Sequence, residues 1–350
     1  MYFPVMLSGP ILRYRDVEEQ LYAPHKFDYV QVTYGFQRML WGFFKKLVIA
    51  ERMAVIVNTV YGNYTQYPGI YIFISTVCFA FQLYADFSGG MDIVIGLSQT
   101  FGLKIAENFR TPYFSKSIQE FWRRWHITLG EWLKDYLFYP LLRTQKFSAL
   151  QNTFKKKFGK KKGKKYATLL AMFVLWFAVG MWHGGSWKFI VGSGLLQWFY
   201  IAVGELGEPL WTKMRALCKI KEGNKLFAFW QQMRTFLLMC ASFVFFRAGS
   251  FTEGLRIYKS MFSACNPQVL WNGAVFALGL DWIEFAIAVL TLLVLLAVSV
   301  LQQKQSVRER IAGKNIMIRW SIWYVLLFVV ILWGYYGPGY SVSEFIYQGF

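Results

Sequence analysis

The chain has 350 residues, of which 56% are apolar, 20% are aromatic and only 16% are charged. Soluble domains typically carry about 25% charged residues, so this composition disfavours a soluble protein. The formal net charge is +19, which could indicate nucleic-acid binding. However, eight of the 38 Lys and Arg residues stand in the single run Phe154–Lys165. The positive charge is therefore better interpreted as a signal of membrane topology, and nucleic-acid binding is a distant second interpretation.

Several long stretches contain no Asp, Glu, Lys or Arg. About 20 apolar residues can cross a bilayer as a helix, so these stretches predict an all-α, polytopic membrane protein. Residues 189–204 and 226–246 are weaker candidates, the second because Arg234 interrupts it. The uncharged stretches are Met53–Ala85, Tyr166–Trp187, Ser260–Leu280, Phe285–Gln303 and Trp320–Ser343.

Three basic connections separate the apolar stretches, at residues 154–165, 205–225 and 304–319. Lys and Arg concentrate in cytoplasmic loops, so we expect these connections in the cytoplasm and the more balanced region 247–284 on the opposite side. The lysine run is also expected to contact anionic lipid head groups. We expect a multi-pass protein of the bacterial cytoplasmic (inner) membrane, with the lipid bilayer as its first partner.

The four cysteines show no paired spacing of the kind that metal sites use, so we expect neither a disulfide framework nor a metal site. They are Cys78, Cys218, Cys240 and Cys265. The start of the chain reads as a Pro-Gly loop and not as a charged and then apolar leader. We therefore expect residues 1–350 to be one membrane-embedded domain, an N-terminally truncated fragment that lacks earlier helices.

In chain order, residues 1–27 are expected to form a short apolar entry and a polar loop, because prolines and Gly9 interrupt them. Asp28–Asn58 is expected to be an amphipathic helix. Gly69–Ala85 is expected to cross the membrane and to reach a tight, close-packed bend at Asp86–Gly90, where two glycines adjoin.

Ser115–Leu142 has an amphipathic helical pattern. Tryptophan and leucine side chains recur every three or four residues from Trp122 onward, while charged residues occupy the other face. Such a helix is expected at the membrane interface or packed against spanning helices. His126 falls on the apolar stripe of this helix.

Ala167–Gly180 is expected to cross the membrane and to reach a break at Met181–Trp187, with Phe189–Gly204 as the return leg. A re-entrant hairpin and two full spans both fit this pattern. With the lysine run in the cytoplasm, His183 is expected deep in the membrane or toward its outer face.

The chain has only three histidines, and two of them, His126 and His183, stand in Trp-rich apolar surroundings, whereas His25 is in a polar loop. The structural interpretation is that each donates a hydrogen bond and does no more. In a membrane, however, ionisable groups are costly and commonly mark a site. Burial disfavours the charged imidazolium, so a neutral histidine able to act as a general base is expected.

Five motifs in this order resemble the membrane-bound O-acyltransferase family, and most closely its bacterial alginate O-acetyltransferase branch. The C-terminal ending Phe345–Phe350 is also similar, so the resemblance covers nearly the whole chain. The combination of FWRRWH with WHG is more specific than either alone. The motifs are Met6–Arg15 (MLSGPILRYR), Tyr84–Gly89 (YADFSG), Glu107–Tyr113 (ENFRTPY), Phe121–Leu129 (FWRRWHITL) and Met181–Gly184 (MWHG).

The resemblance implies a ring of transmembrane helices, with re-entrant and interfacial helices, around a central tunnel. It also implies that His183 matches the catalytic histidine and His126 a second active-site histidine. As residues that support the histidines or bind substrate we expect Trp182, Asp86, Asn108 and Arg123, although Asp86 could equally pair with a nearby arginine.

The sequence departs from the family pattern in three places. Gly90-Met91 replaces a Tyr-Ser pair, Leu142-Arg143 replaces a Gly-Gly pair, and Gln197 stands where many relatives have histidine. These departures put the acceptor surface in doubt more than they do the reaction.

The resulting hypothesis is transfer of an acyl group, most simply acetyl, to hydroxyls of an exported or cell-surface polysaccharide such as alginate. We expect no bound cofactor, an acyl donor that is acetyl-CoA or another acyl thioester, and an extracytoplasmic acyl-transfer partner protein. D-alanyl transfer to teichoic acid is the alternative within the same class. A proton-coupled transporter or flippase is the alternative from another class, although no inverted repeat is evident.

Overall fold

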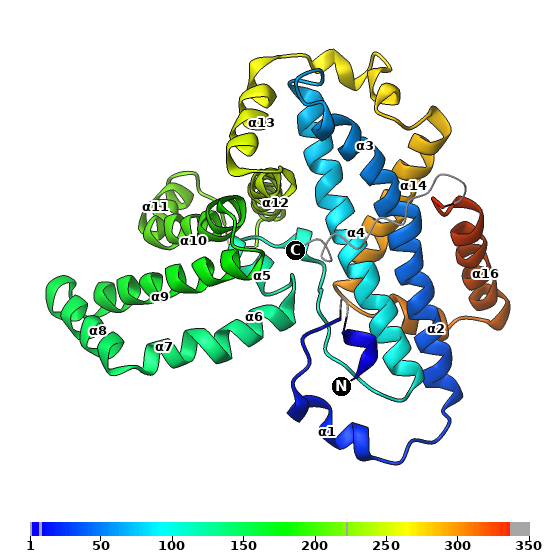
Figure 1. Cartoon of the computed structure of the whole chain (residues 1–350), viewed down its shortest axis with the longest axis horizontal. Helices are drawn as coiled ribbons and strands as arrows, with labels where there is room; N and C mark the ends of the chain where they lie inside the picture. The colour runs from blue at the N-terminus through cyan, green and yellow to red at the C-terminus, as the bar shows by residue number, and fades with distance from the viewer. Residues whose placement is uncertain (1, 7–8, 222, 337–350) are drawn as a thin grey trace. The chain divides into compact units, whose positions relative to one another are not determined.

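The computed structural model describes residues 2–6, 9–221 and 223–336. These residues form helices and connections and contain no strand, which confirms the prediction of an all-α protein. Five helices are long and apolar enough to cross a membrane, so the chain is a multi-pass membrane protein (Figure 1). These helices are Ile70–Thr100, Lys160–Trp182, Lys188–Leu206, Trp282–Gln302 and Ile316–Trp333. The ring and its tunnel stay predictions.

The chain folds as two compact units. Unit 1 comprises residues 1–111 and 257–350, and unit 2 comprises residues 112–256. Both catalytic candidates among the histidines, His126 and His183, belong to unit 2, so the geometry of the histidine pair is described within that unit.

Unit 1 is built around a long continuous helix that runs antiparallel to another (Figure 1). The first combines α2, a π-helical segment η2 and α3, and the second is α4. The expected helix at Asp28–Asn58 is confirmed, with Asp28 accepting bonds from the first amides of α2 as its N-cap. The bounds are α1 Tyr14–Tyr22, α2 Tyr29–Phe43, η2 Phe44–Ala50, α3 Glu51–Gly62, α4 Ile70–Thr100, α14 Trp282–Gln302, α15 Val307–Ala312 and α16 Ile316–Trp333.

The bend expected at Asp86–Gly90 is wrong, because α4 continues without a break to Thr100. The adjoining glycines serve close packing instead. A Cβ on Gly42 would lie 2.7 Å from the carbonyl oxygen of Gly89, and one on Gly89 would lie 2.9 Å from that of Gly42. The backbones of α2 and α4 therefore touch at this crossing, and a side chain on either glycine would separate them.

The expected polar loop at residues 1–27 is wrong in part. The nine-residue helix α1 fits between Pro10 and Pro24, which stop a helix only near their own positions. Ser260–Leu280 is also not a spanning helix. It comprises the end of α13 (Phe251–Ser263) and two 3₁₀ turns, Pro267–Leu270 and Ala274–Ala277.

The turn after α13 binds the start of α4 in unit 1 through Asn266, so this uncharged stretch does not continue as a helix. The Asn266 Oδ1 atom accepts a bond from the Ile70 amide at 2.9 Å, and its Nδ2 atom donates to the Pro68 carbonyl at 3.1 Å. Asn266 thus satisfies a backbone donor at the start of α4 that has no partner within the helix.

The expected span Trp320–Ser343 is helical only as far as Trp333, where α16 ends. Residues 337–343 of this stretch are outside the described residues.

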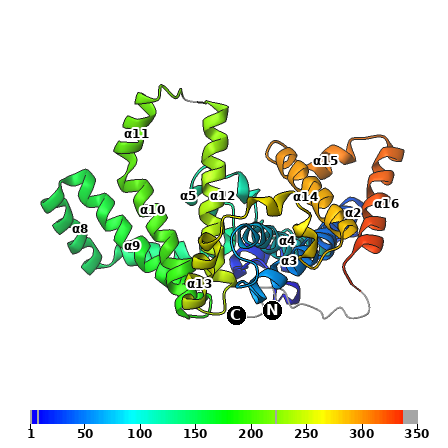
Figure 2. The same ribbon diagram turned by 90° about the horizontal axis from the view of Figure 1, so that it is seen from above.

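Unit 2 contains the short helices of the FWRRWH region, a lysine-rich hairpin and the pair of helices on either side of His183. Figure 2 shows α11 extending from α10 and α12 returning in the opposite direction. The bounds are η3 Pro112–Phe114, α5 Ile118–Trp122, α6 Ile127–Leu133, η4 Lys134–Phe138, α7 Tyr139–Arg143, α8 Gln145–Phe158, α9 Lys160–Trp182, η5 Lys188–Leu195, α10 Leu196–Leu206, α11 Glu208–Leu217 and α12 Lys225–Arg247.

The single amphipathic helix expected over Ser115–Leu142 is wrong, because the structure divides it. α5 ends at Trp122, and α6 begins at Ile127 after a turn that contains His126. His126 has φ +46° and ψ +52°, the left-handed conformation, which an α-helix cannot include. The prediction that His126 lies with the apolar stripe is confirmed, since its side chain is buried.

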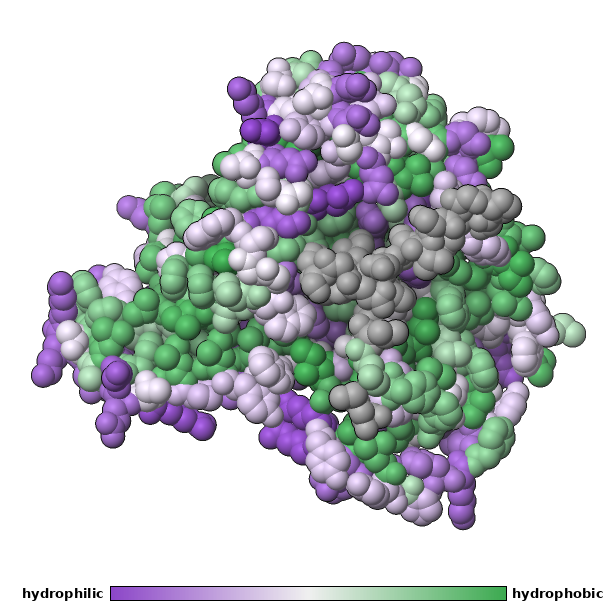
Figure 3. All heavy atoms as spheres, viewed as in Figure 1, coloured by the Kyte–Doolittle hydropathy of each residue, from purple (hydrophilic) through white to green (hydrophobic). Residues whose placement is uncertain are grey.

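The lysine run is helical and not a loop. It includes the last turn of α8 and the first turns of α9, which meet at Gly159, a glycine with φ +83°. Figure 3 shows hydrophobic residues over the visible face of α9 and hydrophilic residues where α8 meets α9. α9 therefore has a strongly cationic start and an apolar body that leads to His183.

Candidate active site

His183 lies at the tip of a helical hairpin. Its amide donates to the Val179 carbonyl at 3.1 Å, so the residue closes the last turn of α9. Gly184 and Gly185 follow with φ +110° and +68°, conformations that side chains rarely adopt. The two glycines turn the chain into η5, and the predicted break within Met181–Trp187 is confirmed.

The two legs of this hairpin are in backbone contact. A Cβ on Gly180 of α9 would lie 2.8 Å from the Phe189 carbonyl oxygen, and one on Gly194 of η5 would lie 2.6 Å from that of Trp176. Only glycine allows such an approach on both legs. The hairpin is therefore a closely packed support that fixes the position of His183 at its tip.

Aromatic rings surround the His183 imidazole. The ring centroids of Trp182, Phe246 and Phe189 lie 4.8, 5.7 and 6.2 Å from it. The His183 residue is 4% exposed and lies between the two candidate spans on either side of it. Burial in these surroundings lowers the pKa of His183 below its ordinary value, so the imidazole is neutral at pH 7.

His126 is buried to a similar extent, with 5% of its surface exposed. Burial lowers the pKa of its imidazole, and the neighbouring His183 lowers it further. The left-handed backbone of His126 costs about 1–2 kcal/mol for a residue with a side chain. Residues held in such conformations cluster at functional sites, where the surrounding structure maintains them.

One indole ring contacts both histidines. The Trp182 ring centroid lies 4.8 Å from that of His183 and 5.7 Å from that of His126, edge-on in each case. Trp182 is nevertheless 45% exposed. The three side chains thus form one cluster, which reaches the protein surface through the indole.

This cluster has the chemical properties that transfer of an acyl group requires. A neutral imidazole has one nitrogen that can accept a proton and one N–H that can donate a hydrogen bond. The first suits a general base on a hydroxyl, and the second suits stabilisation of a developing oxyanion. Two such rings, both in contact with one indole in an apolar setting, can serve the two ends of one reaction.

The structure places Asp86 elsewhere, within the ion pairs of unit 1. Its Oδ1 atom lies 2.5 Å from Lys46 Nζ, which also lies 2.9 Å from Glu51 Oε1. All three residues are buried. The alternative expectation was that Asp86 pairs with an arginine, and the structure pairs it with the lysine Lys46.

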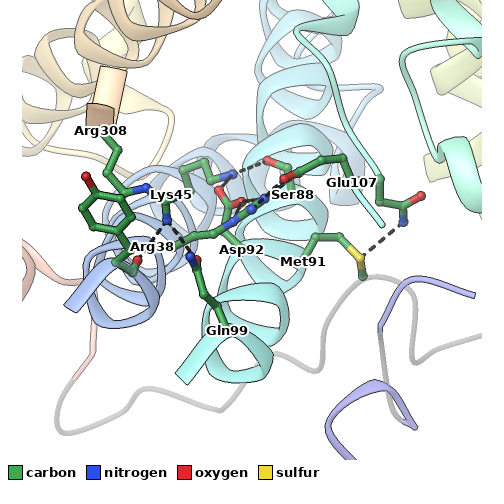
Figure 4. A network of polar contacts seen from close by, with 10 residues as sticks. Arg38, Lys45, Ser88, Met91, Asp92, Gln99, Glu107 and Arg308 are labelled. Atoms are coloured by element: carbon green, nitrogen blue, oxygen red, sulfur yellow. Dashed lines mark hydrogen bonds and ion pairs between the residues drawn. The ribbon is translucent and has the colours of Figure 1, made fainter. Parts of the chain in front are cut away.

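A second group of ion pairs joins α2 and η2 to α4 (Figure 4). Arg38 binds Asp92 at 2.9 Å and both carboxylate oxygens of Glu107, at 2.7 and 2.5 Å. Lys45 Nζ lies 2.7 Å from Asp92 and 2.8 Å from the Ser88 hydroxyl. These contacts tie the two long helices of unit 1 together.

The remaining candidates from the sequence differ in burial. Asn108 is fully buried in unit 1 and donates from Nδ2 to the Met91 sulfur at 3.3 Å. Arg123 is exposed, in the turn that follows α5 in unit 2. Of the four residues expected to support the histidines or bind substrate, Trp182 contacts both histidine rings, Arg123 belongs to the same unit, and Asp86 and Asn108 belong to unit 1.

Sequence reasoning missed two aromatic residues that surround the His183 ring, Phe189 and Phe246. Phe189 is close to the WHG motif, so proximity in sequence could have suggested it. Phe246 is 63 positions after His183, at the end of α12, and no local pattern distinguishes it from other phenylalanines. Among the described residues, no group of three or more His, Cys, Asp or Glu side chains could hold a metal ion.

The fold and the cluster define a polytopic, all-α membrane protein with a buried pair of histidines. Comparison with known proteins identifies the family: residues 1–250 match the membrane-bound O-acyltransferase family. The chain therefore belongs to this family, as the motifs predicted.

Three relatives illustrate the range of the family. A probable alginate O-acetylase from Pseudomonas syringae pv. tomato is 30% identical over 89% of this chain and 54% of its own length. A peptidoglycan O-acetyltransferase from Helicobacter pylori is 30% identical over 74% of this chain and 45% of its own length. A teichoic acid D-alanyltransferase from Bacillus subtilis is 30% identical over 55% of this chain and 46% of its own length. The chain spans about half the length of the curated relatives it matches.

Proposed function

We propose that this protein transfers an acyl group, most simply acetyl, from a thioester to a hydroxyl of an exported or cell-surface polysaccharide. The observation that carries the proposal is the pair of neutral, buried imidazoles on the shared Trp182 indole. Membership of the family supports the reaction class. The relatives named for alginate and peptidoglycan O-acetylation support a polysaccharide as acceptor.

In the proposed reaction, His183 takes the proton of the acceptor hydroxyl as its oxygen attacks the carbonyl carbon of the donor. The N–H of His126 donates a hydrogen bond to the carbonyl oxygen while negative charge develops there. The carbon–sulfur bond of the thioester then breaks, the new ester forms, and the thiolate leaves and takes up the proton. The donor is acetyl-CoA or another acyl thioester.

The cationic start of α9 supports the proposed orientation in the membrane. α9 has 23 residues, roughly 35 Å at about 1.5 Å per residue, and the hydrocarbon core of a bilayer is about 30 Å thick. The lysines at its start favour the cytoplasmic side, so His183 is directed toward the outer side. The donor would then enter from the cytoplasm, and the acceptor from outside a bacterial cytoplasmic membrane.

Two alternatives follow from specific features. D-alanyl transfer to teichoic acid is the second candidate, because one relative is named for it, although that relative matches only 55% of the chain. An extracytoplasmic partner that carries the acyl group onward fits either reaction. A transporter or flippase is the third, and radiolabel transfer from donor to acceptor in reconstituted vesicles separates catalysis from transport.

The test of the proposal is replacement of His183 by Ala in the membrane-inserted protein. We expect acetylation of the surface glycan, measured by mass spectrometry, to fall by about 10²- to 10⁴-fold, the usual contribution of a general base. His25→Ala is the matched control, because His25 is exposed and its ring bonds only to the nearby Gln20 carbonyl among the contacts described. Unchanged acetylation in the His183 variant at equal protein level would contradict the catalytic role.

A further inference from the structure

A series of polar contacts links four elements of unit 2, namely α5, α10, α12 and η5. Trp122 Nε1 of α5 donates to Gln197 Oε1 at 3.1 Å. Gln197 Nε2 of α10 donates to the Ser242 hydroxyl of α12 at 2.7 Å, and Ser242 donates to the Gly192 carbonyl at 3.1 Å. Gln197, whose departure from the family pattern put the acceptor surface in doubt, is fully buried.

The donors and acceptors in this series of hydrogen bonds fix the orientation of the Gln197 amide. An indole N–H can only donate, so the side-chain oxygen of Gln197 must face Trp122 and its nitrogen must face Ser242. The Ser242 hydroxyl can then accept from Gln197 and donate to Gly192. Both ends of the amide are thus bonded, which a buried amide requires. Gln197 can therefore bind the Trp122 indole only through its Oε1 atom.

The Trp122 ring is also held on the side of α9. Its centroid lies 4.9 Å from that of Trp176. Trp176 precedes His183 by seven residues, or about two turns of the same helix, so the two side chains lie on one face of α9. Trp122 is therefore positioned between the amide of Gln197 and the helix that carries His183.

A short, rigid segment connects Trp122 to His126. Within it, Trp125 is buried and stacks on Phe121 with ring centroids 5.4 Å apart. The amide of Trp125 also donates to the Phe121 carbonyl at 2.9 Å. His126 follows in its left-handed conformation. Because these contacts constrain the segment, a displacement of Trp122 should also displace His126.

We propose that Gln197 is a positioning residue: by holding the Trp122 indole, it sets the place of the His126 imidazole beside Trp182 and His183. Its kinetic consequence rests on the proposed acyl transfer, whereas its effect on the position of His126 does not. Gln197 thus acts on His126 indirectly, because its buried amide makes no contact with the histidine rings in the described cluster.

The kinetic test compares Gln197→Leu with Gln197→His in the full-length protein. Leucine removes both bonds of the amide, whereas an imidazole again offers one acceptor and one donor. We expect kcat for acetyl transfer to fall roughly tenfold to a hundredfold in the leucine variant, with KM changed less than twofold, because misplacing a catalytic group slows the chemical step. The histidine variant should recover most of the rate. Thr235→Val is the matched control, since Thr235 is buried on α12 and bonds to the Gln231 carbonyl of its own helix.

A double-mutant cycle with Trp122→Phe tests the bond itself. If the Trp122–Gln197 bond carries the effect, Trp122→Phe in the Gln197→Leu background lowers kcat little further, so the two changes are far from additive. Additive losses would overturn the proposal, because they would show two independent effects. A fall in thermal midpoint with unchanged kcat per folded molecule would also overturn it.

A measurement without catalysis separates this proposal from the proposed function. The chain has three histidines, so ¹³Cε1-labelled histidine gives three NMR signals, one for each of His25, His126 and His183. We expect Gln197→Leu, and more weakly Ser242→Ala, to shift the His126 signal and to leave that of His25 unchanged. Should Gln197→Leu not fold, Ser242→Ala provides the same comparison without adding a histidine signal. An unmoved His126 signal in all variants that fold would refute the positioning role, even if the protein proves to be an acetyltransferase.

Discussion

The two units bury polar groups in opposite ways. Unit 1 encloses full charges and pairs them, as with Lys46 between Asp86 and Glu51 and Lys45 beside Asp92. Unit 2 places His126 and His183 among aromatic rings that favour the neutral imidazole. A paired charge is held in its ionised form and fixes helices, whereas a neutral imidazole can take up a proton during a reaction. We therefore infer that the first set supports the fold, whereas the second set carries the chemistry of the proposed function.

Replacing Lys46 by Met should cause the largest loss of stability, because it leaves two buried carboxylates without their shared cation. Breaking one side of a buried ion pair costs about 3–5 kcal/mol. The free energy of unfolding in detergent measures the loss. Lys164→Met is the control, since Lys164 is exposed at the start of α9 and its replacement should change stability by less than about 0.5 kcal/mol. Equal stability of the two variants would contradict the structural role of the unit 1 ion pairs.

Gly42→Ala should have the next largest effect. The added Cβ would lie 2.7 Å from the Gly89 carbonyl, so α2 and α4 must separate, at a cost of about 1–3 kcal/mol. Gly62→Ala, at the end of α3, is the matched control because nothing lies within 4 Å of its added Cβ. Thermal unfolding of the two proteins checks the difference. If both glycines tolerate alanine equally, the helices of unit 1 are not in backbone contact.

At His126, chemistry and backbone strain can be separated by two substitutions. Both His126→Ala and His126→Gly remove the imidazole, so both should lose acetyl transfer to the same extent. Glycine adopts φ +46° without penalty, so the glycine variant should be more stable than the alanine variant by about 1 kcal/mol. Acetylation and thermal unfolding of the same samples give both quantities. A glycine variant that retained activity would show that His126 matters only for the turn.

The pH dependence should show the smallest effect. Burial lowers the pKa of both His126 and His183, so the general base stays unprotonated below the ordinary histidine pKa of about 6.5. We expect the acidic limb of the kcat profile below pH 6.5. Because the unfolded chain takes up protons at about pH 6.5 and the folded protein does not, stability should fall as the pH falls below that value. An acidic limb at or above pH 6.5 would mean that the imidazoles are hydrated.

The membrane class and the family could be predicted from the amino-acid sequence, which also singled out His126 and His183 as the histidines in apolar surroundings. Composition and uncharged runs suffice for the class because a bilayer selects helices of a certain length and polarity. The helix over Tyr29–Gly62 and the break after Trp182 were also predictable, because N-caps and adjoining glycines act locally.

What the glycines and aromatic rings contact became known only from the folded structure. Gly89 predicts a bend from its local sequence, but α4 is continuous there and Gly89 instead allows the close approach of Gly42 from another helix. Periodicity predicts a helix through His126, but the turn there is maintained by packing around Trp125 and Phe121. Phe246 contacts His183 across 63 residues of chain. Contacts between distant segments depend on how helices cross, which no local spacing of residues specifies.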